Sequence, residues 1–313
     1  MKSVIIIYGP TGIGKTNTSI NLAKELNGEI ISADSMQIYK DMNIGTAKIT
    51  KQEMQGVKHH LIDVCSPKRK FTACDFVNKC EQAIEEIFSK NKQPIIVGGT
   101  GLYLKSLIEG YDFNNVYKDE KIRKKYKNLA EKFGNEYIFN ILKEKNPKRA
   151  SELNVNDTLR VIRALEILEL KKEEVSVKKA QKYNYILFNL TMPREKLYER
   201  INQRVDKMLE DGLKDEVEGL IKSGIKQDCQ AMQGIGYKEF ISYLNGEMNF
   251  DDCIELIKKR TRNYAKRQIT FLNSFKDVIN IPAGENAFLE IIKYLKENNY
   301  ANWRNRKKAR KTI

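Results

Sequence analysis

The sequence predicts an α/β fold in which a parallel sheet is flanked by helices. Over the first 110 residues, apolar runs of strand length alternate with helical patterns. The runs are continuously apolar, as is typical of parallel strands that are buried on both faces. A glycine-rich turn, GPTGIGKT, joins the first run to the first helical pattern. These observations together favour a parallel sheet over an antiparallel one.

The elements of this core can be placed along the chain from their periodicity and their glycine stops. An apolar run returns at residues 183–192, after a long helical stretch, and we expect it to rejoin the sheet. The predicted strands are residues 4–9, 29–34, 59–64, 93–98, 183–192 and 277–282, and the predicted helices are residues 16–27, 74–91, 195–212, 213–224, 251–275 and 286–299.

Between the two parts of the core, residues 111–182 are rich in Lys and Glu with helical spacing and contain no convincing strand. We predict a catalytic core formed by residues 1–110 and 183–300 and an inserted all-helical subdomain at 111–182. The tail, residues 301–313, carries six Lys or Arg and no acidic residue. It suits an arm that orders on nucleic acid, although a tail that only aids solubility is an alternative.

The charge of the chain favours a polyanionic partner. Fifty-six Lys and Arg stand against 41 Asp and Glu, which gives a formal net charge of +15. The run KKRTRNYAKR, residues 258–267, holds six cations and Tyr264 without an acid, and indicates phosphate binding with base stacking. A solvated basic surface is the alternative explanation.

The five cysteines are odd in number and form no CxxC pairs, so the sequence predicts neither a disulfide framework nor a zinc site. This usage fits a reducing cytoplasm. No apolar window reaches the length that spans a membrane. We therefore expect a soluble cytoplasmic protein without a targeting segment.

The turn after the first strand fits the phosphate-loop pattern G-x-x-x-x-G-K-[ST]. In such a loop, backbone N–H groups close around an anion, the lysine neutralises charge and the final hydroxyl reaches Mg²⁺. The sequence therefore predicts Mg²⁺ as a cofactor, with Thr16 as its protein ligand. The predicted phosphate-binding residues are Gly9, Pro10, Thr11, Gly12, Ile13, Gly14, Lys15 and Thr16.

Two further groups of polar residues raise the question of a site. Asp34 ends the second predicted strand, where parallel sheets meet their ligands, although it could equally cap the turn that follows. His59 and His60 are adjacent, but the only nearby carboxylate in that segment is Asp63, which makes a poor metal set. We expect a structural role for the two histidines.

Seven motifs occur in a fixed order: GPTGIGKT, DSMQIYKDMNIGTAK, HHLID, GGTGLYLKSLIEG, RALEI, GIGYKE and TRNYAKRQITF. Together they closely resemble the bacterial tRNA isopentenyltransferase (tRNA dimethylallyltransferase) family, from residue 2 to about 275. Gly12 stands where the family usually has Ala, and ITFL, residues 269–272, stands where the family more typically has a Thr-Trp-Phe sequence. Neither departure removes a reacting group. The resemblance implies a P-loop NTPase-like sheet.

The resemblance also implies the reaction. A dimethylallyl group would pass from dimethylallyl diphosphate to the exocyclic amine of the adenosine just 3′ of the tRNA anticodon. The phosphate loop would hold a leaving diphosphate, with Mg²⁺ bound, and the partner would be the tRNA anticodon stem-loop. Because these groups cannot reach a stacked base, the adenosine must flip out of the loop. We expect a monomer by the same resemblance.

Residue roles follow from matching family positions. Asp34 would be the base that takes the amine proton, Thr100 would position amine and donor, and Arg204 would stabilise the departing diphosphate. Gln37 could pair with adenine through its amide, or simply hydrogen-bond backbone. The positions implied to contact tRNA are Asp34, Ser35, Met36, Gln37, Thr100, Arg123, Thr158, Leu159, Arg160, Val161 and Ile162.

Three other functions remain open at this point. A P-loop kinase or NTPase acting on a small molecule would bind ATP, but would not explain DSMQIY or the basic helices. An adenylate isopentenyltransferase would use a free nucleotide and would not need the helical insert. A non-catalytic RNA-binding protein would not require the combination of Lys15, Asp34 and Arg204.

Overall fold

A computed structural model describes residues 1–111, 119–170, 181–298 and 300. The chain divides into two compact units. The larger unit comprises Met1–Glu109 and Gln181–Ile313, and the smaller one comprises Gly110–Ala180. The basic tail, for which an RNA-binding arm was predicted, lies outside the described residues.

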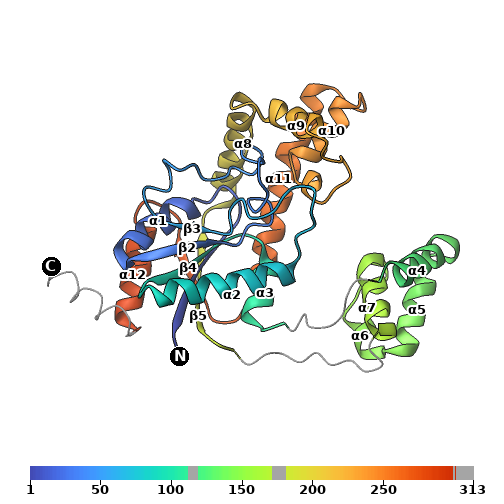
Figure 1. The fold of residues 1–313 in the computed structure, drawn as a ribbon, viewed down its shortest axis with the longest axis horizontal. Helices are drawn as coiled ribbons and strands as arrows, with labels where there is room; N and C mark the ends of the chain where they lie inside the picture. The colour runs from blue at the N-terminus through green and yellow to red at the C-terminus, as the bar shows by residue number, and fades with distance from the viewer. Residues whose placement is uncertain (112–118, 171–180, 299, 301–313) are drawn as a thin grey trace. The chain divides into compact units, whose positions relative to one another are not determined.

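The larger unit is built on a six-stranded sheet in the order β3-β2-β4-β1-β5-β6, and every neighbouring pair is parallel (Figure 1). The predicted α/β class is confirmed. The strands are β1 (Ser3–Tyr8), β2 (Gly28–Ser32), β3 (His59–His60), β4 (Gln93–Gly98), β5 (Asn184–Thr191) and β6 (Val278–Pro282).

Helices bury both faces of this sheet, which explains why its strands are continuously apolar. On one face, Ile5, Ile7 and Ile95 join a core cluster with side chains of α1 (Lys15–Leu26) and α12 (Ala287–Glu297). On the other face, α2 (Ala73–Ser89) packs against β2 and β4. The remaining helices of this unit are α3 (Gly101–Ile108), α8 (Arg194–Glu210), α9 (Leu213–Lys222), the 3-10 helix η1 (Ala231–Gln233), α10 (Tyr237–Leu244) and α11 (Phe250–Leu272).

The third strand is shorter than the sequence predicts. Residues 59–64 were predicted as a strand, but β3 contains only His59 and His60. Leu61 and Asp63 both adopt left-handed backbone conformations, with φ of 61° and 57°. Because such angles are incompatible with an extended strand, pairing with β2 stops after two residues.

The smaller unit is helical, with α4 (Glu120–Phe133), α5 (Asn135–Lys145), α6 (Pro147–Ser151) and α7 (Thr158–Leu170), drawn in green in Figure 1. It has its own core, in which Tyr126, Ile138, Leu142, Val161 and Leu165 are buried together. A unit with its own apolar core can keep its shape independently of the larger one.

Candidate active site

Three neighbouring strands end in three of the motifs. β2, β4 and β1 are adjacent and parallel, and they lead into DSMQ, GGTG and GPTGIGKT respectively. Carboxyl ends of parallel strands meet at one edge of a sheet, so these motifs converge there. A cavity of about 530 Å³ opens at this edge. Its lining includes Thr11, Gly12, Gly14, Lys15, Thr16, Asp34, Ser35, Met36, Gln37 and Arg204.

The glycine-rich loop has the geometry of an anion cradle. Gly12 and Gly14 adopt φ of 79° and 100°, which are accessible to glycine and rarely to other residues. Gly14 precedes α1, so the helix presents the free N–H groups of its first turn to the cavity. The Lys15 ammonium donates to the carbonyl oxygens of Gly9 and Pro10, both at 2.8 Å. The loop therefore holds its cation folded against its own backbone.

Three charged groups influence one another in the cavity. Burial lowers the pKa of Lys15 to about 8; the negative charge of Asp34 opposes this shift and the positive charge of Arg204 adds to it. Burial also lowers the pKa of Arg204, and Asp34 again opposes the shift. Among the described residues, Arg204 has no hydrogen-bond or ion-pair partner. The site therefore contains one carboxylate and an excess of positive charge, as suits an anionic ligand.

Asp34 combines the two roles that its position suggested. Its Oδ1 atom accepts from the backbone N–H groups of Met36, at 2.8 Å, and of Gln37, at 3.3 Å, which caps the turn after β2. The same carboxylate lines the cavity. No hydrogen bond of the described residues occupies Oδ2, so the turn fixes the carboxylate and leaves one oxygen for a ligand.

Thr100 lies beside the cavity rather than in its lining. Its hydroxyl oxygen accepts from Ser35 N at 3.0 Å, and its own N–H donates to Ala33 O at 3.2 Å. These bonds join the GGTG turn to the residues around Asp34. Of the other predicted residues, Ile13 is buried in the core, and Gly9 and Pro10 contribute the carbonyls that hold Lys15.

The side-chain amide of Gln37 hydrogen-bonds to the backbone of the protein. Its Nε2 group donates to Thr46 O at 3.3 Å and Ala47 O at 3.2 Å, and both residues also line the cavity. This is the backbone-bonded alternative that the sequence left open, and the Oε1 oxygen has no hydrogen-bond partner among the described residues.

A glutamate that the sequence analysis did not single out holds the segment that leads into Thr46 and Ala47. Both carboxylate oxygens of Glu216, on α9, accept backbone N–H groups: Asn43 at 2.7 Å, Ile44 at 2.8 Å and Gly45 at 3.1 Å. The Tyr237 hydroxyl donates to Glu216 at 2.6 Å. The three backbone contacts each span more than 170 residues of sequence, so no local sequence pattern predicts them.

Two further arginines line the cavity: Arg200 was missed, whereas Arg267 is the last cation of the predicted basic run at 258–267. Arg200 lies on α8 one helical turn before Arg204, and Arg267 lies on α11, 5.8 Å from the ring of Tyr264. Neither makes an ion pair with a described residue. The i, i+4 spacing of Arg200 and Arg204 was a usable signal, because it places both on one helix face.

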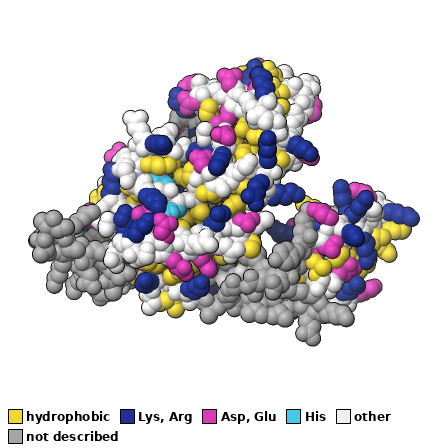
Figure 2. Space-filling view, in the orientation of Figure 1, with side chains coloured by type: hydrophobic (Ala, Val, Ile, Leu, Met, Phe, Trp, Pro, Cys, Tyr) yellow, Lys and Arg dark blue, Asp and Glu magenta, His cyan; other side chains and the backbone are white. Residues whose placement is uncertain are grey.

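Only some of the cations in the basic run at 258–267 are free of partners among the described residues. Lys258 pairs with Asp206 at 2.7 Å, Arg260 with the buried Glu239, and Arg262 with Asn202. These cations hold α11 against neighbouring elements, whereas Lys259, Lys266 and Arg267 remain exposed. On the face drawn in Figure 2, Lys and Arg side chains alternate with Asp and Glu and do not gather in a single patch.

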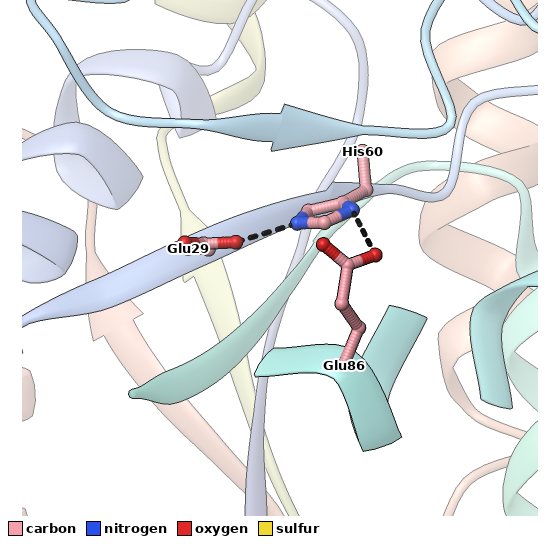
Figure 3. A group of neighbouring side chains, drawn as sticks. All are labelled: Glu29, His60 and Glu86. Carbon is pink, nitrogen blue, oxygen red and sulfur yellow. Dashed lines mark hydrogen bonds and ion pairs between the residues drawn. The ribbon is translucent and has the colours of Figure 1, made fainter. Parts of the chain in front are cut away.

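His60 lies between two carboxylates (Figure 3). Its Nε2 atom is 2.7 Å from Glu29, and its Nδ1 atom is 4.0 Å from Glu86. The three ligand atoms are close enough to surround a metal ion. However, Lys92 already pairs with Glu29, and hydrogen bonds from Lys58 and Lys90 lower the pKa of Glu86 to about 2. Because cations already compensate both carboxylates, the group is an ion-pair network.

The insert residues expected to contact RNA differ in accessibility. Val161 and Ile162 are buried in the insert core, so their side chains are not available. Arg123 donates two hydrogen bonds of 2.9 Å to the buried Glu166, which Arg163 also contacts. Leu159 is 81% exposed, and Arg160 is exposed beside it.

The parallel sheet, with an anion-binding glycine loop after β1, defines a P-loop NTPase-like protein. That class contains kinases, NTPases and group transferases, which the fold alone does not separate. Residues 37–275 match the model of the IPP transferase family. The chain belongs to this family.

Individual relatives agree with the family match. The chain is 48% identical over 303 residues to a tRNA dimethylallyltransferase of Acetivibrio thermocellus, covering 95% of this chain and 97% of that one. A solved tRNA isopentenylpyrophosphate transferase from Bacillus halodurans is 39% identical, with a TM-score of 0.73 over 99% of both chains. A eukaryotic dimethylallyltransferase acting on tRNA is 32% identical, with a TM-score of 0.79 over 96% of this chain and 79% of that one.

Proposed function

We propose that the protein transfers a dimethylallyl group from dimethylallyl diphosphate to the exocyclic amine of the adenosine 3′-adjacent to a tRNA anticodon, releasing diphosphate. The observation that carries the proposal is the shared cavity, where a phosphate loop faces a fixed carboxylate and an unpaired arginine. A kinase needs the loop but has no evident use for Asp34 and Arg204 in the same cavity. The family membership supports the same reading.

On the donor side, the diphosphate lies in the glycine loop. Loop N–H groups and the positive end of α1 bind its oxygens, and Lys15 leaves the Gly9 and Pro10 carbonyls to pair with it. Arg204 faces the bond that breaks. As the carbon–oxygen bond opens, negative charge grows on the departing oxygen, and a fixed cation stabilises it without reorganising.

The donor set fits Mg²⁺. The Thr16 hydroxyl lines the cavity and, among the described residues, has no hydrogen-bond partner. Mg²⁺ commonly takes one or two protein ligands and fills its other positions with water and phosphate oxygens. When bound, it would neutralise charge on the leaving diphosphate.

On the acceptor side, the target adenosine is flipped out of the loop into the cavity. Its amine is a weak nucleophile because the lone pair is delocalised into the ring. As the nitrogen bonds to the allylic carbon, Asp34 Oδ2 takes the amine proton, so that a neutral secondary amine and diphosphate are the products. Ser35, Met36 and Gln37 line the channel around the base, and Thr100 holds their turn in place.

The helical insert and the surface cations would bind the remainder of the stem-loop. Leu159 and Arg160 are the exposed members of the predicted insert contacts, whereas Arg123 acts through Glu166. Lys259 and Lys266, on α11, are available for phosphates. No described helix is long and apolar enough to span a bilayer. We expect a monomer that works in the cytoplasm.

The test is to follow the label from radiolabelled dimethylallyl diphosphate, with Mg²⁺ present. Three acceptors are compared: an adenosine-rich anticodon stem-loop, the same stem-loop with guanosine at the target position, and free AMP. We expect label in the first alone. Label in AMP alone would place the protein among adenylate isopentenyltransferases. Turnover of ATP with label in none would restore the small-molecule kinase.

Donor binding should weaken as the pH rises through about 8. Lys15 is cationic below this pKa and neutral above it, so the unliganded protein progressively loses one of the charges that hold the diphosphate. We expect the dissociation constant for dimethylallyl diphosphate, measured by calorimetry from pH 7 to 9.5, to rise beyond that point. Lys15→Met should bind weakly throughout and lack the inflection. An unchanged inflection in Lys15→Met would assign it to another group.

A further inference from the structure

Gln268, on α11, joins two loops that enter the site from different strands. Its side chain is buried, with 5% exposure. The Oε1 atom accepts from the backbone N–H of Thr11, in the phosphate loop, at 2.9 Å. The Nε2 group donates to the carbonyl oxygen of Gly99, in the turn that carries Thr100, also at 2.9 Å. One amide therefore connects the donor side of the site to the acceptor side.

The surroundings hold this amide in place. The Tyr8 hydroxyl donates to the backbone oxygen of Gln268 at 2.7 Å, which fixes this turn of α11 over β1. A Cβ atom at Gly99 would lie 2.1 Å from Gln268 Nε2, so the contact requires glycine at that position. Among the described residues, no other side chain hydrogen-bonds to both loops.

We propose that Gln268 is a positioning residue that sets the distance between the diphosphate loop and the Thr100 turn. The proposal rests on the proposed function, because it assigns the donor to one loop and the acceptor to the other. Its effect follows from the geometry of displacement: the amine must lie in line with the breaking carbon–oxygen bond. A shift of about 1 Å can cost roughly a hundredfold in rate even when both ligands stay bound.

Loss of this spacing has a chemical signature. If the carbon–oxygen bond opens while the amine is out of line, water can take its place. The water oxygen bonds to the allylic carbon, a proton is released to solvent, and the products are a dimethylallyl alcohol and diphosphate. The ratio of alcohol to prenylated RNA therefore reports alignment, and general destabilisation of the protein would not raise it.

The experiment compares Gln268→Met, which keeps the volume and loses both hydrogen bonds, with Gln268→Glu, which keeps an acceptor for Thr11 and loses the donor to Gly99. Gln230→Met is the matched control: Gln230 also bonds a backbone oxygen and a backbone N–H, both of Phe71, outside the cavity lining. Melting temperature, kcat, both KM values and the product ratio are measured with labelled donor and stem-loop.

We expect both Gln268 variants to lower kcat by roughly ten- to a hundredfold, with each KM within about threefold of the wild type, and to raise the alcohol fraction several-fold. Gln230→Met should leave the ratio unchanged. A wild-type alcohol fraction in either folded Gln268 variant would overturn the proposal. Failure of the wild-type protein to label RNA would instead reject the proposed function, before any variant is compared.

Discussion

Asp34→Asn should slow transfer to the stem-loop by about a hundredfold or more, the usual scale for a lost general base. The substitution isolates proton transfer, because the amide oxygen can still accept from the Met36 and Gln37 N–H groups and so preserve the turn. An amide cannot take the proton of the attacking amine. Single-turnover rates with saturating RNA and donor measure the step, and filter binding should show RNA affinity near that of the wild type.

The control for Asp34→Asn is Asp75→Asn. Asp75 also accepts from a backbone N–H and a hydroxyl, both of Thr72, at the start of α2, and it lies outside the cavity lining. Its substitution should leave the rate unchanged. A wild-type rate in Asp34→Asn would reduce Asp34 to a turn cap. A loss of RNA affinity with an unchanged rate at saturation would make it a binding residue only.

Much of the fold was predictable because its strands are buried on both faces. Such strands have apolar centres: residues 4–8 are apolar throughout, and the runs at 29–34 and 93–98 are centred on Ile30–Ile31 and Ile95–Val97. The run at 59–64 contains only three apolar residues, and only two residues form β3, since the left-handed conformations of Leu61 and Asp63 depend on the tertiary setting. Apolar composition does not report backbone angles.

Some residues of the site could be predicted from local sequence patterns, and others could not because long-range contacts place them. The phosphate loop and Asp34 follow from strand ends and short motifs, which are local properties of the chain. Gln268 and Glu216 could not be found from the sequence, because each holds backbone groups more than 150 residues away. Likewise, the run at 258–267 reads as a free basic face until Asp206 and Glu239 are seen to pair with its cations.

Arg204→Met should lower kcat by about a hundred- to a thousandfold, the range found when a fixed electrostatic contact to a developing anion is removed. The structure gives the reason. Arg204 is half-buried and has no hydrogen-bond or ion-pair partner among the described residues, so the negative charge of Asp34 offsets only part of the cost of desolvating its charge. A cation held in that state binds most strongly where negative charge is greatest, which is on the leaving diphosphate after the bond has opened.

Arg204→Lys tests whether geometry matters as well as charge. Lysine keeps the cation but loses the planar fork that contacts two diphosphate oxygens at once, so we expect partial recovery of kcat. Arg194→Met is the control on the same helix, because Arg194 bonds to Tyr198 and lies outside the cavity lining. Rates are compared at saturating donor. If Arg204→Met raised the donor KM and left kcat unchanged, Arg204 would bind the diphosphate of the ground state as strongly as that of the transition state. Stabilisation of the departing diphosphate would then depend on the loop and Lys15.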